Sequence, residues 1–201
     1  ALPQARLVRM EWRRRGGERP DMDAFYPMEI ITSEAEVAAL LSQQPDPVLL
    51  FPEDRTRPVA MPDFLPQKWA LEGPQQVFRG TCQPSEYYCW QIGVFAARED
   101  VTNVSLKYTD VLNTAGQVAI RGQDITCFNL EGMNNRGERF TKEFALSKGM
   151  VRPLWIGMMV PDDAQGALRG AIQVQVNDHP AQTIELVLHV AGPVIPNHGD
   201  D

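Results

Sequence analysis

Alternating apolar and polar positions dominate the chain from Gln76 onward and predict β-strands that each bury one face. In residues 86–96 the even positions from Tyr88 to Val94 are large and apolar, and the same parity recurs in four later runs. The positions between them are mostly polar. Because each strand has one apolar face, we expect two antiparallel sheets packed face to face. The buried positions would be Tyr88, Trp90, Ile92 and Val94; Val104, Leu106 and Tyr108; Leu154, Ile156, Met158 and Val160; Ile172, Val174 and Val176; and Ile184, Leu186, Leu188 and Val190.

Turn-forming residues separate these runs at intervals typical of a sandwich. They comprise Gly116, Gly122, residues 134–137, Gly166, Gly170 and residues 177–180. We therefore predict a mainly β fold, an immunoglobulin-like antiparallel β-sandwich with one short N-terminal helix.

That helix has a clear start and end. Ser33 and Glu36 form a capping box, in which the serine hydroxyl accepts from the third helical amide and the glutamate reaches back. An apolar stripe follows at helical spacing, and the helix should end near Gln43 because two prolines follow. After it, residues 48–51 predict a buried strand, residues 52–55 a turn, and residues 61–66 a proline-bounded crossing segment.

The chain divides into three parts on this pattern. Residues 1–75 form an N-terminal segment, with the capped helix and the crossing segment, packed on the sandwich. Residues 76–192 form the sandwich itself. Residues 193–201, with two prolines and Gly199, have the composition of a linker and are expected to lead toward a C-terminal domain.

Charge and composition exclude some partners. The formal net charge of −7 disfavours nucleic acid, which requires clustered cations, and we interpret the one basic cluster, around Arg13, Arg14 and Arg15, as a solvated face. No apolar run approaches the ~20 residues of a membrane helix. The three cysteines are an odd number, so at least one thiol should stay free within a monomer. A chain that opens on Ala1 favours a leader already removed, and hence a periplasmic or extracellular location.

No constellation for catalysis emerges. Glycosidase chemistry needs two carboxyl groups facing each other across a pocket, whereas Glu53 and Asp54, like Asp162 and Asp163, are sequence neighbours that tend to diverge. The three histidines lie far apart and favour no shared metal. We therefore predict no catalytic residue, no metal site and no cofactor within this chain.

Seven residues are candidates for contact with a neighbouring domain or a glycan. Tyr87, Trp155 and Met159 have the parity opposite to the core, and a strand that is apolar on both faces is either covered or offers one face to a partner. Trp69 could serve in either kind of contact. The dense polar group Glu53, Asp54 and Arg55 follows a buried strand directly and could reach across an interface.

Several segments, in order, resemble the N-terminal region of large bacterial proteins related to glycoside hydrolase family 123. The strongest are Phe-Pro-Glu-Asp-Arg at residues 51–55 and Trp-Gln-Ile-Gly-Val at residues 90–94. The others are Tyr-Pro-Met-Glu-Ile at residues 26–30, the capped helix, Leu-Pro at residues 65–66, the segment 154–164 and the closing His-Gly-Asp-Asp at residues 198–201.

The resemblance implies an immunoglobulin-like sandwich ahead of a (β/α)-barrel that would begin soon after Asp201. In that family an Asp-Glu pair on the barrel carries out substrate-assisted hydrolysis of N-acetylgalactosaminides, and none of those catalytic positions maps onto this chain. The implied role is a non-catalytic accessory domain that supports and orients the barrel. Two alternatives stay open: a carbohydrate-binding module, and a surface adhesion or assembly domain that adds a free strand edge to a partner sheet.

Overall fold

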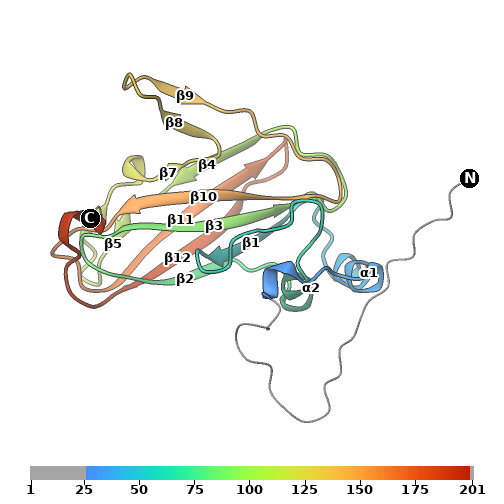
Figure 1. The fold of residues 1–201 in the computed structure, drawn as a ribbon, viewed down its shortest axis with the longest axis horizontal. Coiled ribbons are helices and arrows are strands. Elements are labelled where there is room, and N and C mark those ends of the chain that lie inside the picture. Colours follow the sequence, from blue (N-terminus) through green and yellow to red (C-terminus); the bar gives the residue numbers. More distant parts are fainter. Residues whose placement is uncertain (1–25, 200–201) are drawn as a thin grey trace, which may run out of the picture.

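Two β-sheets face each other in the computed structural model, which describes residues 26–199 (Figure 1). The basic cluster around Arg14 lies outside these residues. The first sheet has the order β1-β3-β10-β7, and the second has the order β2-β12-β11-β5-β6 with β4 also paired to β11. The strands of the first are β1 (Leu49–Asp54), β3 (Tyr87–Phe95), β7 (Thr126–Cys127) and β10 (Val151–Met159); those of the second are β2 (Val77–Cys82), β4 (Val104–Tyr108), β5 (Val111–Leu112), β6 (Val118–Ile120), β11 (Gly166–Val176) and β12 (Gln182–Val190).

The predicted even-numbered faces form the core between the sheets. Trp90 and Ile92 of β3 and Leu154 and Ile156 of β10 are all fully buried, and β11 and β12 contribute their even positions from the opposite sheet. The mainly β sandwich is therefore confirmed. Not every pair is antiparallel, because β2 runs parallel to β12, with Phe78 beside Leu186.

The N-terminal helix α1 (Glu34–Gln43) confirms the predicted capping box. The Ser33 amide donates to Glu36 Oε2 at 2.8 Å, and the Glu36 amide donates to Ser33 Oγ at 3.3 Å. A second helix, α2 (Gln67–Glu72), and a short 3₁₀ turn, η2 (Pro27–Glu29), were not predicted. Helix α2 was missed because its six residues show no side-chain cap and bury only Trp69.

The predicted turn at residues 52–55 is wrong for its first three positions. Strand β1 continues through Asp54, which pairs with Trp90 of β3. Proline at position 52 is tolerated because β1 is an edge strand, where the missing N–H need not serve a second neighbour.

A second apolar cluster lies on the outer face of the first sheet. There α1, α2 and η2 cover the odd-numbered side chains Leu49, Phe51, Phe95 and Val151, and Trp69 stacks on Phe51 with ring centroids 4.9 Å apart. The helices gather at one end of the sandwich (Figure 1).

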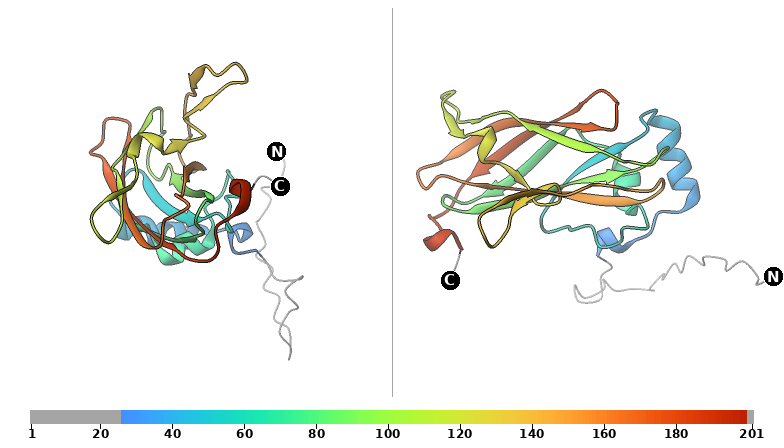
Figure 2. Two further views of the ribbon diagram at one scale, coloured as in Figure 1. Left: turned by 90° about the vertical axis from the view of Figure 1, so that its left-hand side faces the viewer. Right: turned by 90° about the horizontal axis from the view of Figure 1, so that it is seen from above.

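Two further elements project from the sandwich or extend along it. The hairpin of β8 (Glu131–Met133) and β9 (Arg139–Thr141) stands away from the sheets, and its turn lies at the predicted residues 134–137 (Figure 2). The tail carries a 3₁₀ turn, η4 (Pro196–Gly199), at the end of the sandwich opposite α1 and α2. Within residues 26–199 no helix has the length and hydrophobicity needed to span a membrane.

Candidate functional site

The outer face of the first sheet is covered by the chain itself over part of its length only. At one end the indole of Trp69 lies on Gly93. In the middle, Gln91 is fully buried beneath the loop that follows β1, where its side-chain oxygen accepts from the Val59 amide at 3.2 Å and its nitrogen donates to the Arg57 carbonyl at 2.7 Å. The end of this face that carries Tyr87 and Met159 is partly exposed, and we call it the open end.

The open end carries an aromatic patch, which we define as Tyr87, Phe128, Trp155 and Met159. Tyr87, Phe128 and Met159 are 37–39% exposed, and Trp155 is partly buried. Tyr87 of β3 lies opposite Met159 of β10 in the strand register. Isolated apolar residues on a surface need no explanation, whereas four in one place on a sheet face are typical of a contact surface.

Gly157 lies beneath this patch and leaves room for two rings to come close to its backbone. A Cβ at position 157 would be 2.7 Å from Phe128 Cζ and 2.7 Å from Tyr87 Cε1. The two ring centroids are 6.2 Å apart with a tilt of 42°, in the range of favourable aromatic pairs. The rings therefore support each other over a glycine.

Backbone contacts hold Phe128 in place. Its amide donates to the Trp155 carbonyl at 2.9 Å, and the Trp155 amide donates to Asn129 Oδ1 at 2.5 Å. Phe128 was not among the predicted contact residues, because it follows the two-residue strand β7, which is too short to show alternation. Its neighbour Trp155, one of the predicted contact residues, was detectable from parity.

The tail of the described chain contacts the sandwich next to the patch. The Ile195 amide donates to the Pro84 carbonyl at 2.9 Å, and His198 Nδ1 lies 2.9 Å from Ser85 Oγ. The Ser85 amide in turn donates to the Val160 carbonyl at 3.1 Å. Because residues 85 and 160 flank Tyr87 and Met159 along the chain, the tail and the aromatic patch share one end of the sandwich.

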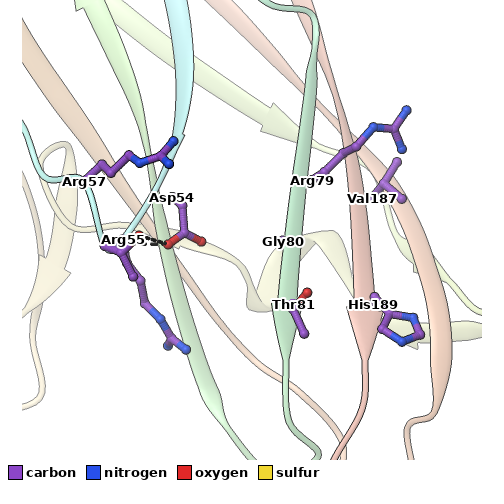
Figure 3. A pocket seen from close by; sticks show the side chains of 9 residues that line it. Asp54, Arg55, Arg57, Arg79, Gly80, Thr81, Val187 and His189 are labelled. Carbon is purple, nitrogen blue, oxygen red and sulfur yellow. Dashed lines mark hydrogen bonds between the residues drawn. The ribbon is translucent and has the colours of Figure 1, made fainter. Parts of the chain in front are cut away.

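An open hollow of about 640 Å³ lies at the edge of the sandwich, between the end of β1 and strand β2. Figure 3 shows Asp54 and Arg57 on one side of it and Arg79 and Thr81 on the other. Val187 and His189 of β12 complete the wall on the side of the second sheet.

Asp54 is held as a carboxylate at this edge. Partial burial by itself raises the pKa of Asp54. The Thr56 amide and hydroxyl donate to the Asp54 carboxylate at 2.9 and 2.7 Å, and the Tyr88 hydroxyl donates to it at 3.3 Å. These hydrogen bonds and the positive charge of Arg55 together outweigh the effect of burial, so the pKa of Asp54 lies below its usual value. Arg55 forms an ion pair with Glu86 and lies 4.9 Å above the centre of the Tyr88 ring.

Glu53 and Trp69 are buried at the N-terminal cluster. Glu53 is 5% exposed, and its Oε2 accepts from Lys68 Nζ at 2.5 Å and from Trp69 Nε1 at 3.1 Å. Its Oε1 lies 3.7 Å from Nη1 of Arg57, which lines the hollow, and Trp69 is 2% exposed. Of the seven candidate contact residues, the structure places Tyr87, Trp155 and Met159 in the patch, Asp54 and Arg55 beside the hollow, and Glu53 and Trp69 in the interior.

The fold and this surface define a two-sheet β-sandwich domain with one partly uncovered apolar face. Among residues 26–199 no three His, Cys, Asp or Glu side chains are grouped so that they could hold a metal ion. No protein-family model and no curated protein matches the sequence.

A solved structure shares the fold. A family 123 glycoside hydrolase from Clostridium perfringens, described for glycolipid glycan hydrolysis, is similar to this chain at 15% identity and a TM-score of 0.56. The similarity covers 75% of this chain and 28% of that enzyme, so the chain corresponds to little more than a quarter of its length. Spo0M, a sporulation control protein from Bacillus subtilis, has 8% identity and a TM-score of 0.34, covering 73% of this chain and 50% of its own. A PapD-like domain of human CEP192 has 11% identity and a TM-score of 0.31, and the similarity covers 58% of this chain and 82% of that domain.

Proposed function

We propose that this chain is a non-catalytic accessory domain of a glycoside hydrolase, which supports and orients a C-terminal catalytic barrel. The observation that carries the proposal is the aromatic patch beside the tail. A domain that follows residue 199 would start next to Tyr87 and Met159, and would be able to cover the patch without a long connection.

The size and chemistry of the patch suit contact between domains of one chain. Such interfaces are modest in area and more polar than permanent ones. The patch offers rings and a methionine at its centre, and the exposed strand ends and loops around it are polar. Burial of these side chains would supply roughly 25 cal/mol for each Å² of apolar surface removed from water.

The fold shared with part of the Clostridium perfringens enzyme supports the same role. In the described part of this chain, Glu53 and Glu86 form internal ion pairs with Lys68 and Arg55. This use of buried carboxylates suits an accessory role.

The test compares this chain with the polypeptide encoded by the full open reading frame. The double variant Trp155→Ser and Met159→Ser should lower the melting temperature of the longer polypeptide by several degrees more than that of residues 1–201, because docking buries further surface of both side chains. Val118→Ser, at a 52% exposed position of the second sheet, is the matched control and should change neither. An equal fall in melting temperature in both polypeptides would contradict docking at the patch.

Activity separates the accessory role from a catalytic one. Residues 1–201 alone should not hydrolyse aryl N-acetylhexosaminides, whereas the longer polypeptide should. Hydrolysis by the short chain that one carboxylate substitution abolishes would overturn the proposal.

A carbohydrate-binding role is the second candidate, favoured by the partly exposed rings of Tyr87 and Trp155 on a sheet face. Calorimetric titration of the chain against a glycan panel tests it. Binding that Trp155→Ala removes and Val118→Ser retains would favour the binding module over the docking surface.

A further inference from the structure

Strand β2 is an edge strand whose free side has unused main-chain groups. In the described part of the chain it pairs with β12 alone. The Glu185 amide donates to the Gln76 carbonyl at 2.7 Å, and the Ala191 amide donates to the Cys82 carbonyl at 3.0 Å, so the even residues of this segment point their main-chain groups toward β12. Because these groups alternate sides along a strand, the N–H and C=O of Arg79 and Thr81 face the free edge.

The hollow described above opens along this free edge. Arg79, Gly80 and Thr81 line it, and Asp54 and Arg57 lie across it from them (Figure 3). The strand is also well supported from behind, since the Tyr88 hydroxyl lies 2.1 Å from the place where a Cβ on Gly80 would be. A free edge that is held rigidly and opens into space is a template for a further strand.

The charge around the hollow is positive, although the chain as a whole carries a net charge of −7. Arg55, Arg57 and Arg79 are in the lining. Arg55 pairs with Glu86 and Arg57 with Glu53, whereas Arg79 has no ion pair among residues 26–199. Asp54 is the one carboxylate in the lining, and it is already engaged by Thr56 and Tyr88. An added strand would place its side chains about 5 Å from those of Arg79 and Thr81, where opposite charges stabilise the pairing.

We propose that the free edge of β2 binds an extended, acidic segment of a partner polypeptide by strand addition. The main chain of the segment pairs with Arg79 and Thr81, and its carboxylates lie beside Arg57 and Arg79. Main-chain pairing supplies the affinity in this mode of recognition, and alternate side chains supply the specificity. The site is separate from the aromatic patch, so it does not depend on the accessory role.

The experiment uses residues 1–201 and a fluorescein-labelled peptide of alternating valine and glutamate, followed by fluorescence anisotropy. Saturable binding is expected. Thr81→Pro removes an N–H that faces the free edge but leaves every hydrogen bond to β12 in place, so it should weaken peptide binding at least tenfold. Thr81→Val keeps that N–H and should bind the peptide as the parent does. Arg79→Glu should weaken binding at least tenfold, and Arg121→Glu, at an exposed site away from the hollow, should not change it. Circular dichroism melts establish that each variant is folded.

Two further measurements test the mode of binding. A peptide N-methylated at alternate residues should not bind, and one with lysine in place of glutamate should bind at least tenfold more weakly. Amide exchange by NMR should show Arg79 and Thr81 exchanging rapidly in the free chain and becoming protected when the acidic peptide is added.

Four outcomes would overturn the proposal. They are the absence of binding at millimolar peptide, equal binding by Thr81→Pro and Thr81→Val, protection of Arg79 and Thr81 in the free monomer, and concentration-dependent association of the chain that Thr81→Pro abolishes. Protection in the free monomer would mean that another segment of this chain already occupies the edge. Association that Thr81→Pro abolishes would mean that a second copy of the chain occupies it.

Discussion

The indole of Trp69 lies on the α-carbon of Gly93, with its Cη2 only 2.1 Å from the position that a Cβ on residue 93 would take. This contact joins helix α2 to the outer face of β3. It also explains why a glycine stands in the middle of a central strand, where it would otherwise weaken the sheet.

Gly93→Ala should therefore destabilise the chain by about 1–3 kcal/mol, because the methyl group displaces a buried ring. Trp69→Ala should cost about 3–5 kcal/mol through lost packing. In the double variant the methyl group added at position 93 meets no ring. The loss in free energy of unfolding should therefore be smaller than the sum of the two single losses by at least about 1 kcal/mol. Urea denaturation of the four proteins measures this coupling, and strict additivity would contradict the contact.

Glu53 should be needed for stability although it touches no surface. Glu53→Ala leaves Trp69 Nε1 and Lys68 without their buried acceptor and should lower the free energy of unfolding by about 2–4 kcal/mol. Glu72 also pairs with Lys68, at 2.8 Å, but its side chain is 53% exposed. Glu72→Ala is thus a matched control, and by urea denaturation it should cost about 0.5 kcal/mol or less. Similar losses in the two variants would show that the burial of Glu53 is unimportant.

Asp54 should make the chain sensitive to acid. Its pKa is lower in the folded state than in the unfolded chain, because the bonds from Thr56 and Tyr88 outweigh partial burial. Its contribution to stability is therefore fully present above the unfolded pKa of about 3.9 and is lost as the pH falls through the lower folded pKa. Stability measured by urea denaturation from pH 5 to pH 2 should fall less steeply in Asp54→Asn than in the parent. The exposed Asp63→Asn serves as control, and parallel curves for Asp54→Asn and the parent would exclude the effect.

The three cysteines should titrate as free thiols of unequal reactivity. Burial raises the pKa of Cys82 and of Cys127 to about 11, and it also raises that of the partly exposed Cys89. Since the thiolate is the reactive form and must be accessible, Cys89 should react first with a disulfide reagent at pH 8. Three equivalents should react in guanidinium chloride, and Cys89→Ser should remove the fast phase. A faster phase that survives this substitution would contradict the burial of the other two.

Period-two patterning predicted most of the fold because burial on one face imposes a repeat that is visible in the sequence. The five long apolar runs became the core of two facing sheets, and the capping box of α1 formed with the predicted partners. The same reasoning located Tyr87, Trp155 and Met159 on the outer face, since parity alone distinguishes the two faces of a strand.

The patterning failed where structure depends on a partner distant in sequence. Strand β1 runs on through Pro52 to Asp54 because β3 pairs with it there, and α2 exists because Phe51 and Gly93 receive Trp69. Phe128 belongs to the patch because its amide donates to the Trp155 carbonyl, while the Trp155 amide donates to Asn129 Oδ1. None of these contacts leaves a local signal.

The sequence by itself determined that this protein is a β-sandwich, which side chains fill its core and which outer positions are apolar, because strand periodicity and side-chain hydrophobicity are local properties. Only the tertiary structure decided which of those outer positions stay accessible. Trp69 and Trp155 are both aromatic residues near a strand face, yet one is sealed by Gly93, Phe51 and Glu53 and the other stands at the open end of the sheet. That difference arises from the packing of α1 and α2 over one end of the outer face, which no single segment encodes.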